Sequence, residues 1–261
     1  MNTLGDFQFI ELGFDEGVAW LTFNRPEKLN SFTAAMHSEV REALARVQQS
    51  PEVRCLVITG NGRGFSAGQD LADLDMATLG EVVERDYNPL LRTITTLNIP
   101  VVASVNGVAA GAAANLALAC DIVLAARSAK FIQPFSQLGL VPDGGGTWTL
   151  PRLVGLARAT ALCMTGEPVS AETAETWGMI WRCIDDEQLR TETTALAHRL
   201  ANQATVGLGY TKMLLRVSQT STLDEQLNLE RDFQNAASKT DDFSEGVDAF
   251  LSKRKPVFTG R

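Results

Sequence analysis

Three short apolar runs restrict the fold of this chain more than any other feature of its sequence. Residues 55–59, 100–105 and 121–126 are apolar at nearly every position, as are strands that are buried on both faces of a sheet. Helical patterns accompany them at residues 33–49, with Thr33 as the N-cap, and at residues 107–119. Because buried strands that alternate with helices form β-α-β crossovers, we predict an α/β fold built on a mostly parallel sheet.

A hairpin precedes this core, and a helical tail follows it. Residues 7–12 and 18–23 alternate around a turn at residues 14–17, which predicts two antiparallel strands. After about residue 185 no strand pattern remains, and we expect helices at residues 186–204, 206–218, 222–238 and 242–253. The chain is therefore expected to comprise a core at residues 1–200 and a helical region at residues 201–261, which packs on the core or on another subunit.

Charge and composition exclude several classes of function. The chain carries 23 Lys and Arg against 31 Asp and Glu, a net charge of -8, so we predict no nucleic-acid partner. Four well-separated cysteines and the lack of a signal-peptide pattern indicate reduced thiols and a cytoplasmic protein. No apolar run is long enough to span a membrane, and the two histidines have no metal-ligand spacing, so we predict neither a membrane partner nor a metal site.

Residues 64–68 read Gly-Phe-Ser-Ala-Gly and match the G-x-S-x-G pattern of a hydrolase nucleophile elbow. An elbow places its serine at a tight turn directly after a strand, whereas residues 61–63 separate this motif from the preceding apolar run. His198, which would complete a triad, lies inside a predicted helix. The second interpretation uses the backbone of the loop, because glycines let a ligand approach free N–H groups.

A second glycine-rich stretch, residues 106–112, leads a strand into a helix rich in small residues. Free N–H groups at such a helix start stabilise negative charge. One N–H group from each of the two loops would form an oxyanion hole with two donors. Close packing between a strand and a helix explains the same small residues, so the pattern alone leaves both interpretations open.

A third stretch, residues 140–148, places Asp143 before three glycines. Asp143 is either the N-cap of the helix that follows or a carboxylate that points into an apolar site. In the second case desolvation raises its pKa, which suits a general base. The sequence pattern alone is compatible with both roles.

The order of these motifs resembles the enoyl-CoA hydratase/isomerase (crotonase) superfamily. The matching stretches are Asn24-Arg25-Pro26 with Asn30, residues 65–71, 106–111, 119–122 and 138–147, and the basic ending at residues 250–255. The resemblance covers essentially the whole chain. It implies a crotonase-like spiral of β-β-α units followed by a helical C-terminal trimerisation region, and hence a homotrimer or a hexamer made of two trimers.

The resemblance also implies which residues bind the substrate. The family binds acyl-CoA thioesters and holds the enolate oxygen with two backbone N–H groups, which here belong to Gln69 and Ala112. The residues implied in binding CoA or the acyl group are Arg25, Lys28, Leu29, Ala67, Asp70, Leu71, Phe135 and, near the C-terminus, Lys255. Because CoA is part of the substrate, the resemblance implies no separate cofactor.

Two departures from the hydratase pattern bear on the reaction. Hydratases of the family activate water with two glutamates, and Asn115 and Phe135 stand at those positions here. Neither side chain ionises, so the acid/base pair for water addition is missing. Asp143 stands where some isomerases of the family carry a single carboxylate base, and Asn115 is expected to orient either Asp143 or a substrate oxygen.

A closer resemblance, through residues 63–71, 87–90, 135–143 and 177–181, is to the branch of the family that isomerises ring-1,2-epoxyphenylacetyl-CoA. It implies conversion of the ring epoxide to the seven-membered oxepin-CoA, together with a shift of cis-3-enoyl-CoA to trans-2-enoyl-CoA. The alternatives are a general Δ3,Δ2-enoyl-CoA isomerase of fatty-acid β-oxidation, an enoyl-CoA hydratase, and a non-catalytic acyl-CoA-binding protein.

Overall fold

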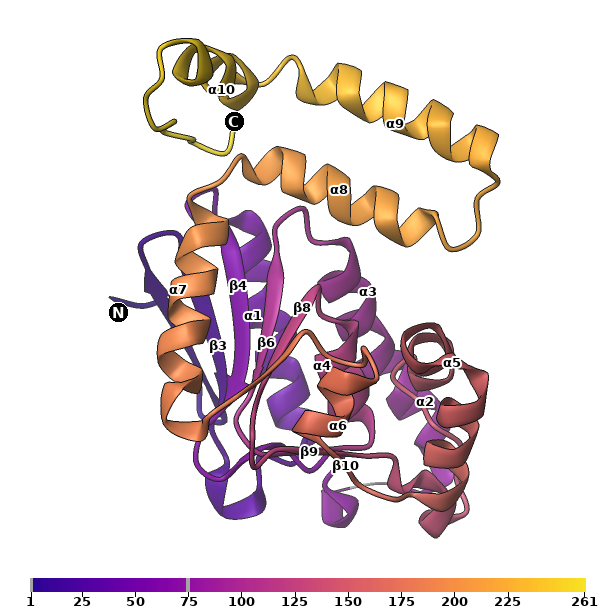
Figure 1. Ribbon diagram of the computed structural model, residues 1–261. Coiled ribbons are helices and arrows are strands. Elements are labelled where there is room, and N and C mark those ends of the chain that lie inside the picture. The colour runs from indigo at the N-terminus through magenta and orange to yellow at the C-terminus, as the bar shows by residue number, and fades with distance from the viewer. Residues whose placement is uncertain (1, 74–75) are drawn as a thin grey trace.

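Two β-sheets form the centre of the molecule, with helices packed around them (Figure 1). The computed structural model describes residues 2–73 and 76–261. The larger sheet contains, in spatial order, β1 (Asn2–Thr3), β2 (Ile10–Asp15), β3 (Val18–Phe23), β4 (Cys55–Gly60), β6 (Val101–Val105), β8 (Ile122–Ala126) and β11 (Arg182–Ile184). Every neighbouring pair from β3 to β11 is parallel, whereas β1, β2 and β3 pair antiparallel. The predicted mostly parallel sheet is confirmed.

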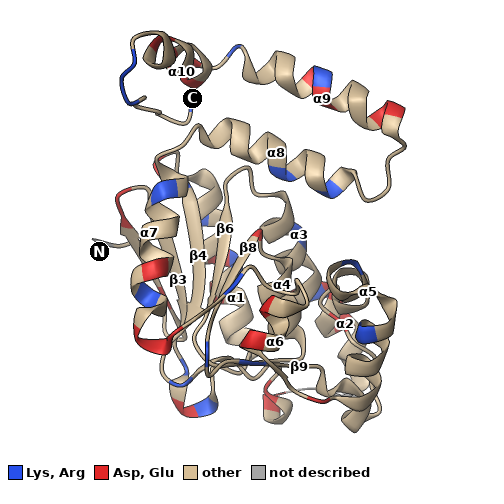
Figure 2. Cartoon of the chain, viewed as in Figure 1, with Lys and Arg blue, Asp and Glu red and all other residues tan. Residues whose placement is uncertain are grey.

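The hairpin of β2 and β3 is also confirmed, with its turn at Glu16 and Gly17. Both turn residues have positive φ, 44° and 84°, as the tight turns that match strand twist require. The first strand of the hairpin begins at Ile10, three residues later than the pattern predicts. Figure 2 shows that the central strands are free of charged residues, in agreement with their burial on both faces.

The smaller sheet was not predicted from the sequence. It contains, in spatial order, β10 (Val169–Ser170), β9 (Lys130–Ile132), β7 (Val108–Ala110) and β5 (Gly64–Ser66). The predicted helix at residues 107–119 is corrected by it, since Val108–Ala110 is a strand and the helix begins at Ala112. Pairing with β5 and β9 on either side overrides the local helical preference of these small residues.

The helices follow the strands in a repeating order. They are α1 (Ala34–Gln49), α2 (Leu79–Val82), α3 (Asn88–Thr96), α4 (Ala112–Ala119), α5 (Gly146–Thr165), α6 (Ala171–Thr176), α7 (Leu189–Ala201), α8 (Thr205–Val217), α9 (Leu223–Ala237) and α10 (Asp241–Leu251). The 3₁₀ turns are Pro26–Lys28, Leu71–Asp73, Met76–Thr78, Pro134–Leu138 and Asp186–Gln188, and Val83–Tyr87 is a π-helical turn. The units β4-β5-α3, β6-β7-α4 and β8-β9-α5 repeat the predicted β-β-α pattern.

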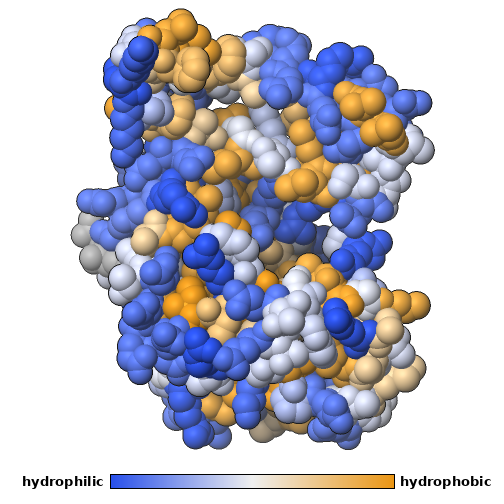
Figure 3. All heavy atoms as spheres, in the orientation of Figure 1, coloured by the Kyte–Doolittle hydropathy of each residue, from blue (hydrophilic) through white to orange (hydrophobic). Residues whose placement is uncertain are grey.

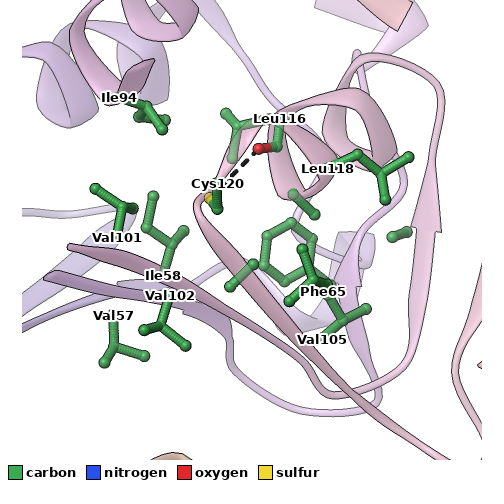
Figure 4. Close-up of a cluster of buried hydrophobic side chains, with 14 of the residues drawn as sticks. Val57, Ile58, Phe65, Ile94, Val101, Val102, Val105, Leu116, Leu118 and Cys120 are labelled. Atoms are coloured by element: carbon green, nitrogen blue, oxygen red, sulfur yellow. Dashed lines mark hydrogen bonds between the residues drawn. The ribbon is translucent and has the colours of Figure 1, made fainter. Parts of the chain in front are cut away.

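The core is apolar and closely packed between the strands and the helices that follow them. Figure 4 shows Ile58 and Val101, from neighbouring strands, on the same side of the sheet as Leu116 and Cys120 from α4 and its C-terminal end, whereas Val57 and Val102 point to the opposite side. The Cys120 thiol donates to the carbonyl of Leu116 at 3.5 Å, and burial raises its pKa to about 12. This cysteine is therefore an inert packing residue.

Among the C-terminal helices, α8 is bound to the core, whereas α9 and α10 are largely exposed. Lys212 of α8 forms an ion pair with Asp121 at 2.8 Å and donates to the carbonyl of Ile94 at 2.8 Å, which fastens α8 to the core. In α9 no described residue is buried, and α10 exposes Phe250 at 82% and Leu251 at 74%. Figure 3 shows hydrophobic side chains at the surface where α10 lies. No described helix meets the length and hydropathy needed to cross a membrane.

Candidate active site

The loop after β5 turns one backbone N–H group, that of Gln69, away from the protein's own acceptors. Gly68 has φ +87°, which glycine adopts readily. Phe32 N donates to the carbonyl of Gly68 at 2.8 Å, and Asp70 N donates to the carbonyl of Phe32 at 2.9 Å. In a trans peptide the carbonyl and the following N–H point in opposite directions, so the Gln69 N–H faces away from Phe32. Within the described residues it has no acceptor.

The first N–H of α4, that of Ala112, is free for a similar reason. Gly111 has φ +57° and ψ −133°, and its carbonyl accepts from Asn115 N at 3.2 Å. The Ala112 N–H therefore points out of the helix N-terminus, where no intrahelical acceptor exists. A Cβ atom on Gly68 would lie 3.9 Å from Ala112 N and 2.8 Å from the Ala110 carbonyl oxygen, so the two loops touch and only glycine fits between them.

Asp143 lies beside this pair of loops, in the turn before α5. A Cβ atom on the next residue, Gly144, would lie 3.5 Å from the Cα of Ala112. The N-cap of α5 is Gly145 and not Asp143, so the N-cap interpretation of Asp143 is wrong. The Oδ1 atom of Asp143 is buried without a partner in the described structure. Burial raises the pKa of this carboxyl to about 6.

Asn115 holds the Asp143 turn in place from α4. Its side chain is fully buried, its Nδ2 donates to the backbone carbonyl of Asp143 at 2.8 Å, and its Oδ1 accepts from Gln133 Nε2 at 2.8 Å. A Cβ atom on Gly146 would lie 2.4 Å from Asn115 Nδ2, so α5 begins in direct contact with this amide. Asn115 was expected to orient either Asp143 or a substrate oxygen, and these contacts favour Asp143.

Two aromatic residues lie next to these loops. Phe135 is 7% exposed, and a Cβ atom on Gly111 would lie 3.6 Å from the end of its ring. Tyr87 was not assigned a role from the sequence, although it belongs to one of the resembling stretches. Its hydroxyl donates to Gln69 Oε1 at 2.9 Å. Its ring packs against the fully buried His37, with ring centroids 4.4 Å apart.

The residues expected to bind CoA or the acyl group gather on two adjacent loops, except for Phe135, which lies in the 3₁₀ turn Pro134–Leu138, and Lys255. Ala67 N donates to the carbonyl of Leu29 at 2.9 Å, and Arg25 forms an ion pair with Asp70 at 3.2 Å. Lys28 and Leu71 are exposed on the same loops. Lys255 comes four residues after α10, and α10 lies at the opposite end of the molecule from β9 and α6 (Figure 2), so one chain does not bring Lys255 to the site.

The hydrolase interpretation does not fit this geometry. Ser66 is fully buried inside β5, and its hydroxyl donates to the carbonyl of Asn30 at 2.7 Å. His198 lies on α7, 3.5 Å from an Asp15 oxygen. The described residues also contain no group of three or more His, Cys, Asp or Glu side chains arranged to hold a metal ion.

Fold and site together define a crotonase-type protein. The family model for enoyl-CoA hydratase/isomerase matches residues 13–261, and the chain belongs to this family of enzymes. It is 53% identical to the 1,2-epoxyphenylacetyl-CoA isomerase of Escherichia coli K12, over 97% of this chain and 99% of that protein.

Two further relatives bear on the reaction and the fold. The trans-2-decenoyl-[acyl-carrier-protein] isomerase of Streptococcus mutans is 36% identical over 98% of this chain and 100% of that protein. A crystal structure of an enoyl-CoA hydratase/isomerase from Mycobacterium abscessus matches with a TM-score of 0.92 and 36% identity, over 97% of this chain and 100% of that one. The expected crotonase fold is thus confirmed.

Proposed function

We propose that this enzyme is an isomerase of acyl-CoA thioesters that works through an enolate. The observation that carries the proposal is the raised pKa of Asp143, about 6, beside two free N–H groups, those of Gln69 and Ala112. A base needs a pKa near the working pH, and an enolate oxygen needs preorganised donors. The names of two relatives, both isomerases, support the same reaction class.

The preferred substrate in this proposal is 1,2-epoxyphenylacetyl-CoA. The thioester oxygen accepts from the N–H groups of Gln69 and Ala112 while Asp143 takes a proton from the α-carbon. The electron pair of the broken C–H bond forms the enolate, with its charge on the thioester oxygen. The carbon–carbon bond shared by the epoxide and the six-membered ring then breaks, and its two electrons join those of the two ring double bonds to make the three double bonds of the oxepin ring. Asp143 returns the proton to the ring carbon that is γ to the thioester, the carbonyl re-forms, and the remaining double bond joins the α-carbon to the ring. Substrate and product contain the same atoms, so the reaction needs no cofactor or co-reactant.

The same groups suit a shift of cis-3-enoyl-CoA to trans-2-enoyl-CoA, which is the second activity we propose. One carboxylate removes the proton from the α-carbon and returns it to the γ-carbon, while the same oxyanion donors hold the enolate. Water addition is disfavoured, because Asn115 and Phe135 stand in place of two ionisable groups and both Asn115 side-chain atoms are already hydrogen-bonded inside the protein.

Replacement of the base tests the proposal. Asp143→Asn should lower kcat for both substrates about 10²–10⁴-fold, the range that general acid–base catalysis supplies, while acyl-CoA binding measured by calorimetry changes little. Asp6→Asn, at an exposed aspartate of the N-terminal segment, is the matched control and should leave kcat unchanged. Normal turnover by Asp143→Asn would contradict the assigned base. Release of free CoA thiol would indicate a thioesterase, and binding without α-proton exchange a non-catalytic binding protein.

A further inference from the structure

A tyrosine outside this mechanism contacts the residue that carries one of its two N–H donors. The Tyr87 hydroxyl donates to Gln69 Oε1 at 2.9 Å, a hydrogen bond of good length. The contact from Gln69 Nε2 to the carbonyl of Asp70 is 3.5 Å long and weak. The His37 ring, which packs against Tyr87, also interacts with the Gln69 side chain. The bond from the Tyr87 hydroxyl is the shortest of these hydrogen bonds to the Gln69 amide.

The direction of Tyr87 is set by an unusual turn and by its packing. Tyr87 is the last residue of the π-helical turn Val83–Tyr87, a rare geometry that often occurs at functional sites. The turn buries Tyr87 to 2% exposure and the preceding Asp86 to 1%. Arg41 holds Asp86 at 2.8 Å, and the ring of His37 packs edge-on against Tyr87. A hydroxyl fixed in this way has little freedom to turn from Gln69.

The Gln69 N–H depends on such an anchor because its backbone is fastened along one edge only, by the two bonds to Phe32. A small rotation of the Gly68–Gln69 peptide changes where the N–H points, and an oxyanion donor works only when it is aimed in advance. We propose that Tyr87 is a positioning residue, whose hydroxyl fixes Gln69 and so aims the Gln69 N–H at the thioester oxygen. This inference rests on the proposed function and deepens it.

The surrounding charges keep the hydroxyl in its donor form. Burial, the carboxylate of Asp143 and that of Asp86 raise the pKa of Tyr87 well above its ordinary value, so the hydroxyl stays protonated while Asp143 is ionised. Burial also lowers the pKa of His37 to about 4, and the ring against Tyr87 is therefore neutral at neutral pH. The Tyr87 hydroxyl is therefore protonated and the His37 ring neutral at every pH above about 6, where Asp143 is ionised and can act as a base.

The test removes the hydroxyl and follows enolate formation directly. The probe is phenylacetyl-CoA, which has the acidic α-carbon but no epoxide, and the readout is exchange of its α-protons in deuterated water by NMR. We expect Tyr87→Phe to lower the saturated exchange rate about tenfold, a fraction of the loss of a whole oxyanion donor, with KM changed less than about twofold. Tyr210→Phe removes the only other tyrosine hydroxyl of the chain, on α8, and should have no effect.

A double-variant cycle separates positioning from general loosening of the fold. Gln69→Met removes the acceptor at similar length and should show the same loss as Tyr87→Phe, and the double variant should lose no more than either single variant. The inference would be overturned if the fold-losses in exchange rate of the two single variants multiplied in the double variant, or if only KM changed. If Tyr87→Phe folds poorly, Gln69→Met, at a partly buried loop residue, decides the matter alone by its saturated exchange rate.

Failure of this inference is distinct from failure of the proposed function. A wild-type enzyme that exchanges no α-protons overturns the enolate mechanism itself. A wild-type enzyme that exchanges them, with Tyr87→Phe and Gln69→Met exchanging at the same rate, overturns only the role of Tyr87.

Discussion

At the scale of single residues, burial determines what Asp143 can do. Its Oδ1 atom has no hydrogen-bond partner in the described structure, whereas Asp70, with Arg25 beside it, keeps a pKa below its ordinary value. Two aspartates on neighbouring loops thus have opposite properties because one is desolvated without a partner and the other is paired. Only the first is suited to accept a proton near neutral pH.

The pKa of Asp143 predicts a pH profile. A base must be deprotonated, and the pKa of this carboxyl is about 6, so kcat/KM should be constant above pH 7. Below pH about 6 it should fall about tenfold per pH unit, since the ionised fraction falls in that proportion. Rates measured between pH 4.5 and 8.5 check this, and a constant rate down to pH 4.5 would assign the base to another group.

The raised pKa of Asp143 also predicts how protein stability depends on pH. A carboxyl whose pKa is higher in the folded than in the unfolded protein binds protons more tightly when folded, so ionised Asp143 destabilises the fold at pH above 6. Asp143→Asn should therefore raise the free energy of unfolding by about 1–2 kcal/mol at pH 7.5. The gain should disappear near pH 3, below the ordinary aspartate pKa of 3.8, where the carboxyl is protonated in both the folded and the unfolded state. Urea unfolding at pH 7.5 and at about pH 3 measures the gain; an equal gain at both would contradict the assigned cause.

Ser66 provides a contrasting prediction, because it contributes structure and no chemistry. Its hydroxyl donates to the Asn30 carbonyl and accepts from Gly68 N at 3.2 Å. Ser66→Ala leaves both backbone groups without this partner and should lower the free energy of unfolding by about 1–3 kcal/mol, while the folded variant keeps most of its kcat. Thermal unfolding and turnover measured on one sample check this. Complete loss of turnover in a stable variant would revive the nucleophile interpretation.

At the scale of elements, contact between α4 and α5 sets the position of Asp143, the proposed base. Asn115 reaches from α4 to the Asp143 carbonyl, and α5 begins at Gly146 because only a residue without a Cβ fits against the Asn115 amide. Ala112, a proposed oxyanion donor, and Asp143, the proposed base, are thus held at the N-termini of two helices that touch. A shift of either helix would misalign the pair.

Gly146→Ala tests this contact. The added methyl would meet Asn115 Nδ2 at 2.4 Å, so we expect the Asp143 turn to shift, kcat to fall about tenfold or more and stability to fall by about 1–3 kcal/mol. Gly207→Ala is the matched control, since a Cβ there meets nothing within 4 Å and alanine favours the helix. Equal kinetics for the two variants would show that the α4–α5 contact does not position the base.

At the scale of the whole molecule, the exposed apolar face of the C-terminal helices is the main unsatisfied feature. Phe243 and Val247 of α10 are half-exposed, and Phe250 and Leu251 are largely exposed. Such a face costs free energy in water and is commonly covered by another protein surface. Together with the family resemblance, it leads us to propose that the enzyme assembles as a homotrimer, alone or paired into a hexamer.

The assembly prediction has a direct measurement. The wild-type protein should elute with a mass three or six times that of the 28.2 kDa chain in light scattering. Phe250→Asp should shift it toward smaller species, because a charge buried in an apolar interface is strongly unfavourable. Ser252→Asp, at an exposed position just after α10, should not. A wild-type protein that runs as a monomer would contradict the proposal.

The sequence by itself determined the parts of this protein that depend on local pattern. Apolar runs on both faces specify buried strands wherever they occur, so the parallel sheet, the hairpin, the N-cap at Thr33 and the four tail helices could be predicted, with boundaries shifted by a few residues. Ordered glycine-rich motifs also indicated the family. These features need no knowledge of what lies next to them in space.

Only the tertiary structure decided which groups face one another. Three-residue strands such as β7 carry too little pattern to be recognised and form because partners lie on both sides. The N-cap alternative for Asp143 was excluded because α5 is capped at Gly145, and Tyr87 contacts Gln69 because of a π-helical turn that the sequence pattern did not predict. Burial and hydrogen bonding join residues far apart in the chain, so they become visible only once the chain is folded.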